Sequence, residues 1–516
     1  MSKSEQESPS EMSIRRSQLT TPFGVGAIYQ ESGESFVACD TSMWVDEDLD
    51  KIELTRLSQP LGVHSFRQGP IKKKPWEKGP GITGVPFMRF PEWLSCPKCN
   101  KLFKLGTWDG PSSPRCPKKC KATPIPMRWV TICKNGHLDD VPWWRWLHDD
   151  KNNTCKKTDE DLTFITSGEG GGGLGSLIVK AECGRKKTIK DLMNPFGLQA
   201  RCRGKQPWEE GSSKCDAERV VVLKGGSNVH YPMIRSALDI PLTPSNEHDE
   251  NDEVAQCVKE HSAWENIVNL ARENPEGLFY ETNLDQIAEN CGTDVETVDR
   301  IVKEEIGDVQ DEPNSQEVDW DDMNHAEFQA FLSGNSTADF KIETSEITSS
   351  KSEIPEITKK QIGDAFASVV LATTIREVRA FTGFTRVQGF GGQGIELVAP
   401  DLGKKPGGSK VRYLPATENK GEGIFLQLDE SFVHDWEKQS SVIQRVEKTK
   451  EIIKDKGISG MPEPSPRFIA LHTLAHLLIR RLTFSCGYSS SALRERIYSR
   501  TPDEGDPMAA IFIFTA

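Results

Sequence analysis

Two pairs of closely spaced cysteines constrain the fold of this chain more than any other feature of its sequence. Cys96 and Cys99 form a CxxC pair, and after sixteen residues Cys116 and Cys120 form a CxxxC pair. Each pair can deliver two thiolates to one tetrahedral ion, with Zn–S bonds of about 2.3 Å. Because all four candidate ligands are cysteines, the spacing predicts a closed, structural zinc site. The alternative, a set of free surface thiols, would be a liability in a cytosolic protein.

The expected cellular compartment decides whether the remaining cysteines form disulfides or bind metal. The N-terminus is polar and lacks the apolar stretch of a secretory signal, and no run of eighteen apolar residues occurs. We therefore expect a cytoplasmic protein without a membrane span. Its thirteen cysteines should not form a disulfide framework, and those that cluster should bind zinc. A weaker second zinc set has long spacings and consists of Cys155, Cys183, Cys202 and Cys215. Cys133 and His137 form another candidate half-site, and ordinary buried thiols are expected at Cys39, Cys257, Cys291 and Cys486.

The formal charge of −13 is unevenly distributed along the chain. Residues 247–327 hold 25 Asp and Glu against 4 Lys and Arg, whereas residues 67–134 hold 15 Lys and Arg against 3 Asp and Glu. These stretches carry net charges of −21 and +12. The basic stretch predicts a surface that faces a polyanion, and the acidic stretch predicts one that faces protein or solvent.

Hydrophobic patterning predicts a mixed α/β, multi-domain protein with an α/β C-terminal domain. We expect a disordered segment at 1–14, a β-rich region at 15–245 with zinc modules at about 90–220, and an acidic helical insertion at 246–334. A Ser/Thr/Glu-rich linker is expected at 335–359. The α/β domain then spans 360–516 and begins with a helix at about 360–380. The sequence stops at an apolar, strand-like run, so either a partner completes this strand or the natural chain continues, and we expect the latter.

Other motifs have ordinary structural explanations. His472 and His476 lie four residues apart in a Leu-rich helix but lack the adjacent glutamate of a zincin, so helix-contact or core histidines are expected. The tryptophans of VPWWRWLHDD predict either the core of a small domain or a stacking face for single-stranded bases. The glycine-rich stretches at 168–176 and 389–394 lack a phosphate-loop or βαβ context. The sequence shows no convincing NTPase site, nucleophile triad or acidic nuclease cluster, and we expect a non-catalytic protein.

Six stretches, in the same order, resemble the DrmB subunits of bacterial DISARM anti-phage systems. They are RRSQLTTPFGVGAIY at 15–29, PMRWVTICKNGHLDDVPWWRWLH at 126–148, NVHYPMIRSALDIP at 228–241, IREVRAFTGFTR at 375–386, GEGIFLQL at 421–428 and LHTLAHLLIRRL at 471–482. The last two also resemble a domain of unknown function at the C-terminus of some zinc-containing superfamily-two helicases. In that family further cysteines follow the terminal strand, and this sequence ends without them.

The resemblance implies a zinc-binding accessory subunit that forms a hetero-dimer with a DrmA-like helicase, beside a DNA methyltransferase that marks host DNA. It also implies a second zinc site, because cysteines recur in similar proteins at the places of Cys155, Cys183, Cys202 and Cys215. The subunit would extend the DNA path of the helicase through phosphate contacts of Lys72, Lys73, Lys74, Lys101, Lys104, Arg115, Lys118 and Lys119. These cations could equally form a solvated face. The alternatives are a zinc-dependent nuclease, which needs an open metal position, and a scaffold that never contacts DNA.

Overall fold

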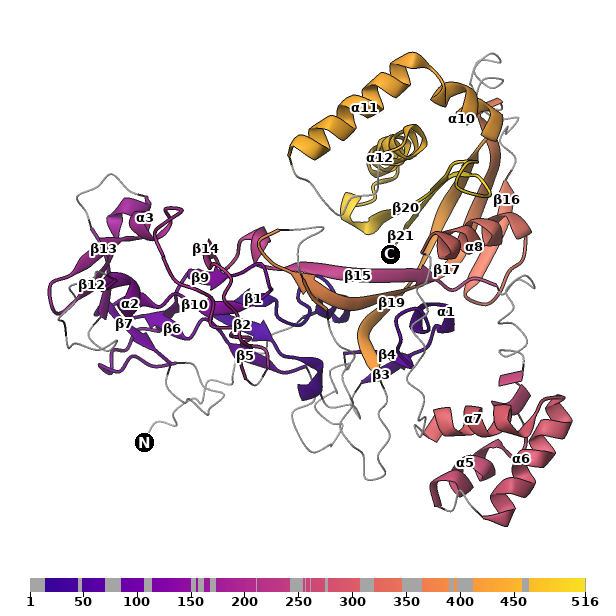
Figure 1. Cartoon of the computed structure of the whole chain (residues 1–516), viewed down its shortest axis with the longest axis horizontal. Coiled ribbons are helices and arrows are strands. Elements are labelled where there is room, and N and C mark those ends of the chain that lie inside the picture. Colours follow the sequence, from indigo (N-terminus) through magenta and orange to yellow (C-terminus); the bar gives the residue numbers. More distant parts are fainter. Residues whose placement is uncertain are drawn as a thin grey trace, which may run out of the picture.

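The chain is a mixed α/β protein with several separate cores, seen here in a computed structural model (Figure 1). The structure describes residues 14–44, 49–69, 85–105, 114–149, 155, 162–167, 173–209, 211–241, 254–255, 257–259, 261–273, 277–306, 320–345, 364–388, 394–396, 412–456 and 464–515. Within these residues, no helix is long and apolar enough to cross a membrane. The segment 1–14, expected to be disordered, lies outside the described residues except for its last residue. Lys72, Lys73 and Lys74 also lie outside them.

Three small sheets make up most of the N-terminal half. The first has the order β1 (Ile28–Glu31), β2 (Glu34–Ala38), β5 (Phe87–Arg89), and the second has the order β10 (Leu138–Asp140), β9 (Trp129–Ile132), β14 (Val220–Leu223). The third has six strands in the order β13 (Lys186–Thr188), β12 (Leu177–Ala181), β11 (Leu162–Thr166), β7 (Lys101–Lys104), β6 (Trp93–Ser95), β8 (Ile125–Pro126). The short helices here are α1 (Thr55–Ser58), α2 (Trp143–Leu147) and α3 (Ile189–Leu192).

The tryptophan-rich stretch forms α2, which packs against the six-stranded sheet. Trp143 and Trp146 are fully buried with Leu102, Leu162 and Val179 of that sheet. The interpretation as the core of a small domain is therefore confirmed for these two residues, whose rings are not available to stack on bases.

A nine-stranded sheet dominates the other half of the molecule. Its main path has the order β15 (Tyr231–Leu238), β17 (Phe366–Thr385), β19 (Tyr413–Leu428), β21 (Met508–Thr515), β20 (Leu493–Arg500). Off this path, β16 (Phe340–Ser345) and β18 (Gly394–Glu396) pair with β17, and β4 (Ser65–Gln68) pairs with β19 and β3 (Asp50–Ile52). Strands from three distant parts of the sequence thus meet in one sheet.

The helix expected at about 360–380 is wrong, because these residues belong mostly to the long strand β17. Val369, Val370, Thr373, Thr374 and Ile375 are β-branched, and such side chains pack well on a pleated surface but lose freedom in a helix. The segment expected to be a linker also contains β16, which pairs with the first half of β17 while β15 pairs with its second half.

The terminal apolar run is the strand β21, which is hydrogen-bonded on both sides, by β19 and β20. Its side chains alternate between two cores. Phe512 and Phe514 join a core with Phe328 and Phe331 of α8 (Trp320–Ser333), whereas Ile511 and Ile513 pack against α12 (Pro466–Cys486). Helices on both faces explain the continuous apolar sequence of the strand. Two further helices, α10 (Glu430–Glu437) and α11 (Ser440–Asp455), lie beside α12 (Figure 1).

The region expected to be one acidic helical insertion divides in two. Helices α5 (Trp264–Glu273), α6 (Leu278–Cys291) and α7 (Val295–Ile306) share a core of their own, whereas α8 packs on the large sheet. Glu327 of α8 is almost fully buried and accepts hydrogen bonds from Arg56, Arg496 and Tyr498. One acidic residue of the stretch is therefore an internal ion-pair partner and does not face solvent.

Two cysteines of the helical subdomain correct the sequence analysis. Cys257 and Cys291, expected to be ordinary buried thiols, form a disulfide between residues that are 34 apart in the sequence. The packing of α5 against α6 brings Cys257, which precedes α5, next to Cys291 at the end of α6. Nothing in the local spacing of the two cysteines predicts this contact.

Candidate metal centres

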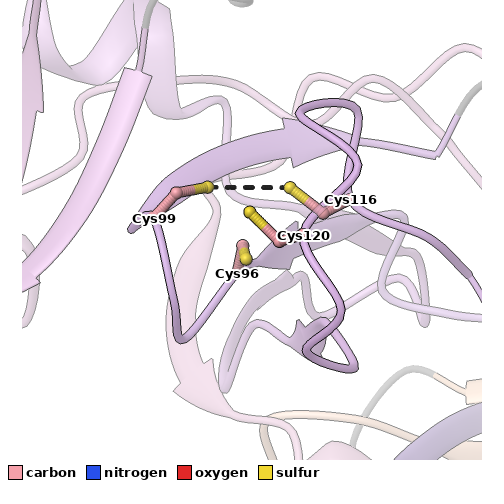
Figure 2. A group of neighbouring side chains, drawn as sticks. All are labelled: Cys96, Cys99, Cys116 and Cys120. Carbon is pink, nitrogen blue, oxygen red and sulfur yellow. Dashed lines mark hydrogen bonds between the residues drawn. The ribbon is translucent and has the colours of Figure 1, made fainter.

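The first cysteine cluster lies where the spacing predicts it (Figure 2). Cys96 and Cys99 lie on the turn between β6 and β7, and Cys116 and Cys120 lie on the loop before β8. All four sulfurs lie within 4.8 Å of one another, and the Sγ atoms of Cys99 and Cys116 are 3.6 Å apart. Sulfurs bound to one tetrahedral ion at about 2.3 Å must lie close to this range, so the residues present fit a single metal ion.

Each knuckle of this cluster closes through the backbone. The residues Asn100 and Lys119 have positive φ angles of 59° and 55°, which turn the chain back sharply. The amide of Asn100 donates to the Cys96 carbonyl at 2.8 Å, and that of Lys119 donates to the Cys116 carbonyl at 2.8 Å. The two pairs of cysteines are thus held toward a common centre without any metal-dependent contact.

The electrostatics of the first cluster favour thiolate ligands unevenly. Burial raises the pKa of Cys96, but the amides of Cys99 and Lys98 and the neighbouring thiols outweigh it and lower that pKa to about 7. The hydrogen bond with Cys99, burial and the other two thiols raise the pKa of Cys120 to about 12. Four thiols this close cannot all ionise without a compensating charge, and a divalent cation supplies one.

A second cluster gathers Cys133, His137, Cys202 and Cys215. Cys133 follows β9 and His137 precedes β10, so the two lie on one hairpin turn, with the Cys133 Sγ and His137 Nδ1 3.4 Å apart. Cys202 and Cys215 come from the segment before β14, and the four ligand atoms lie within 4.8 Å of one another. A hydrogen bond with Cys202 lowers the pKa of Cys133 to about 7. The set matches a closed site of three cysteines and one histidine.

Neighbouring groups orient the ligands of the second cluster. The His137 Nε2 lies 2.7 Å from the Ser213 hydroxyl, so a proton shared there leaves Nδ1 to face the sulfurs. The chain segments that carry Cys202 and Cys215 pass close to each other at Gly204, whose φ is +67°. A Cβ at this position would lie 1.5 Å from the Ser213 carbonyl oxygen. Only glycine fits this crossing. The sequence analysis did not single out Ser213 or Gly204.

The buried Arg386 fixes the same hairpin from the large sheet. This side chain is fully buried and donates to the carbonyl oxygens of Gly136, Val229 and Gly26. Burial lowers the pKa of Arg386 to about 9, and the Cys133 charge opposes that shift. A metal site with three thiolates and a neutral histidine carries a net charge of about −1 around a divalent ion, which complements the guanidinium.

A third group consists of His148, Cys155 and Cys183. His148 follows α2 and Cys183 lies on the turn between β12 and β13, with the His148 Nε2 3.2 Å from the Cys183 Sγ. The His148 Nδ1 lies 2.9 Å from the Trp144 carbonyl oxygen, so its proton points away from the sulfurs. The Arg185 amide and the His148 side chain lower the pKa of Cys183 to about 7.

The second zinc set expected from the sequence is therefore wrong in its composition. Cys202 and Cys215 join Cys133 and His137, whereas Cys155 and Cys183 join His148. The candidate half-site of Cys133 and His137 was the one local signal for the correct pairing. The long spacings between these cysteines do not indicate which of them lie close together. Their division between the two clusters therefore depends on the tertiary fold.

The predicted DNA-contacting residues that the structure describes lie at and near the first cluster. Arg115, Lys118 and Lys119 are exposed on its second knuckle, whereas Lys101 is half-buried on β7. Lys104 is exposed but pairs with Glu92 at 2.9 Å. In the described part of the chain, no ion pair involves Arg115, Lys118 or Lys119. These three cations form what we call the knuckle cations.

Comparison with known proteins adds a relative that spans nearly the whole chain. Residues 15–231 match a family described as "Domain of unknown function (DUF8724)". The chain is 27% identical over 505 residues to the "DISARM protein DrmB" of Bacillus paralicheniformis, covering 93% of this chain and 82% of that protein. The predicted resemblance to DrmB is confirmed.

The structure gives physical roles to the DrmB-like stretches. The stretch 126–148 contains the second-cluster hairpin, the buried tryptophans of α2 and His148, so it contributes ligands to two clusters. The stretch 375–386 is the second half of β17 and ends on Arg386. In the stretch 15–29, Gly26 receives a hydrogen bond from that arginine. Val229, in the stretch 228–241, receives another, so four of the DrmB-like stretches meet around the second cluster.

Proposed function

We propose that this chain is a zinc-bound, non-catalytic subunit of an anti-phage DISARM complex, which forms a hetero-dimer with a DrmA-like helicase and supports its DNA binding. The observation that carries the proposal is the similarity to DrmB over 93% of the chain. The chemistry of the clusters supports the part that concerns zinc, and the position of the knuckle cations supports the part that concerns DNA. The complex would act in the cytoplasm.

Zinc is the ion that the donor sets favour. The first two clusters offer four cysteines, and three cysteines with one histidine. Sulfur-rich tetrahedral sets select zinc or iron–sulfur clusters over magnesium, calcium or manganese, which prefer oxygen. Both four-ligand sets leave no position for water, so they would stabilise the fold and would not activate a nucleophile. The third group would hold zinc with a further ligand.

The DNA path would run along the first cluster. A zinc ion with four thiolates carries a net charge of about −2, which the surrounding cations offset. Cations beyond those needed for this compensation remain available to phosphates. The knuckle cations and Lys72, Lys73 and Lys74 belong to the stretch of net +12, and the latter three lie outside the described residues.

The proposal competes with a nuclease and with a scaffold. A zinc-dependent nuclease needs a metal with an open position and a means to activate water, which the two four-ligand sulfur sets do not offer. A scaffold would bind the helicase and leave its DNA affinity unchanged. One experiment distinguishes both the nuclease and the scaffold from the proposed function.

The test is co-expression of this chain with a DrmA-like helicase, followed by size-exclusion chromatography and DNA binding at two salt concentrations, with and without this subunit. We expect a stable complex that binds DNA more tightly than the helicase alone. Failure to co-purify overturns the proposal. A complex with unchanged DNA affinity supports the scaffold, and metal-dependent cleavage lost on one point mutation in this chain supports the nuclease.

Charge reversal then locates the DNA path. Changing Lys72, Lys73 and Lys74 to Glu, or the knuckle cations to Glu, should weaken DNA binding and lower the salt slope by up to about 3, roughly one for each lost phosphate contact. Assembly with the helicase should persist. The matched control reverses three exposed lysines of and just beyond α11, namely Lys448, Lys454 and Lys456. Equal affinity and slope in the first two variants and the control would remove these cations from the DNA path.

A further inference from the structure

Two histidines of the DrmB-like stretch 471–482 have no role in the proposal above. His472 and His476 lie one turn apart on α12, with side chains 43% and 61% exposed. They are therefore not core residues, which was one of the two explanations that the sequence offered. Their Nε2 atoms are 2.9 Å apart, and both rings point toward one carboxylate, that of Glu495 on β20.

Glu495 comes from the face of β20 that α12 covers. Ile497, two residues later and on the same face, packs against α12 with Ile511 and Ile513 of β21. The adjacent Arg494 and Arg496 point to the opposite face, where both pair with Glu377. The carboxylate of Glu495 is thus the acidic group that this strand presents to the two histidines.

The distances among the three side chains match one shared cation. The Glu495 Oε1 lies 3.2 Å from the His472 Nε2 and 3.6 Å from the His476 Nε2. Nitrogen and oxygen ligands bound at about 2.0–2.2 Å to one ion lie roughly 3.0–3.5 Å apart. A single proton between the two imidazoles would satisfy only one pair of atoms, whereas an ion satisfies all three. Among the described residues, the second oxygen of Glu495 is shielded from solvent and has no hydrogen-bond partner.

We propose that His472, His476 and Glu495 bind one divalent first-row transition-metal ion in an open site. Two histidines and one carboxylate are a ligand set of zinc and of non-haem Fe2+ sites that keep free coordination positions. Because both histidines are more than two-fifths exposed, the free positions face solvent and can take water or another oxygen donor. This site differs in kind from the two four-ligand sulfur clusters, which are closed, and it does not depend on the proposed helicase partner.

The helix and the strand position the ligands before the metal arrives. The spacing i, i+4 places both imidazoles on the same face of α12. Leu471 and Ala475, one position before each histidine, are buried against β21 and fix the rotation of the helix. The ring of Phe468 stacks on His472 with centroids 5.6 Å apart, which limits the freedom of that imidazole.

The experiment titrates Co2+ into the full-length chain, with zinc kept in the sulfur clusters and weakly held zinc removed by a mild chelator. Binding is followed by calorimetry and visible absorption. We expect one Co2+ per chain with weak d–d bands and without the strong thiolate charge-transfer absorption that cysteine ligands would give. His476→Ala and Glu495→Gln should each weaken binding by roughly tenfold or more. Because His476 is exposed, its variant should keep the unfolding temperature of the wild type.

The matched control is His434→Ala, which removes an exposed histidine from the neighbouring helix α10. It should bind Co2+ as the wild type does. Absence of a stoichiometric Co2+ site in the wild type would overturn the proposal. So would unchanged affinity in the folded His476→Ala variant, or thiolate charge transfer that shows the ion in a sulfur cluster.

Discussion

Replacing Arg386 with Met removes a buried cation that joins the second cluster to the large sheet. The side chain donates to three carbonyl oxygens, on Gly136, Val229 and Gly26, and is fully buried. Hydrogen bonds to a charged group contribute about 1.5–3 kcal/mol each. The variant also escapes the cost of burying the charge, so the net loss should be nearer about 3–5 kcal/mol, which corresponds to about 1–3 kcal/mol for each buried carbonyl left without a donor.

The assay follows zinc release from the second cluster in increasing urea, with a chromogenic chelator. Because the chain has several cores, zinc release reports the local transition more directly than a global melting temperature. With a urea slope of about 2–3 kcal/mol per molar, a loss of about 3–5 kcal/mol lowers the midpoint by roughly 1–2.5 M. Zinc in the first cluster should leave at its usual midpoint, because Cys96 and its partners lie in a separate core.

The matched control is Arg235→Met on the neighbouring strand β15. Arg235 is exposed and lies over the Trp320 ring at 4.5 Å from its centroid. Such an exposed cation–π contact contributes about 0.5–1 kcal/mol, so the midpoint should move only slightly. If Arg386→Met releases zinc at the wild-type urea concentration, the coupling between the sheet and the second cluster is refuted.

Three further predictions rest on single features. Gly204→Ala should lose the zinc of the second cluster alone, because its Cβ would meet the Ser213 carbonyl at 1.5 Å; elemental analysis checks this, and full zinc content in the variant would contradict it. Burial and the Arg386 charge lower the pKa of His230 to about 3, so the unfolded chain binds a proton that the folded chain does not between about pH 6.5 and 3. The free energy of unfolding should therefore fall on acidification by up to about 1.4 kcal/mol per pH unit. In urea titrations at pH 7 and 5.5, His230→Gln should lose less stability than the wild type between the two pH values. An equal loss in both proteins would exclude this contribution. Reducing the Cys257–Cys291 disulfide should destabilise α5–α7 by about 3–4 kcal/mol, seen as faster hydrogen exchange confined to these helices, and unchanged exchange there would show that the disulfide does not support them.

Local sequence signals predicted what local geometry controls. The CxxC and CxxxC pairs specified the first cluster because both knuckles close within a few residues. The helix α12 agrees with the Leu-rich helix expected around His472 and His476 for the same reason. The pairing of the large sheet was harder to predict, since β15 and β17 pair across more than a hundred residues.

Tertiary contacts controlled the features that the sequence left open. The correct partners of Cys202 and Cys155 depend on how two sheets are placed, and the spacing carries no trace of this. The missing glutamate beside His472 argued against a metal site, yet Glu495 reaches the same place from a strand that follows in the sequence. Arg386 could not be singled out because its three acceptors are backbone carbonyls.

Zinc content of the purified full-length chain tests the central claim most directly. Native mass spectrometry and elemental analysis should find at least two zinc ions per chain. The double variant Cys96→Ser/Cys99→Ser should lose one ion, and Cys133→Ser/Cys202→Ser should lose another, because each pair supplies half of one closed site. A folded chain without zinc, or one whose zinc content is unchanged in both double variants, would contradict the account.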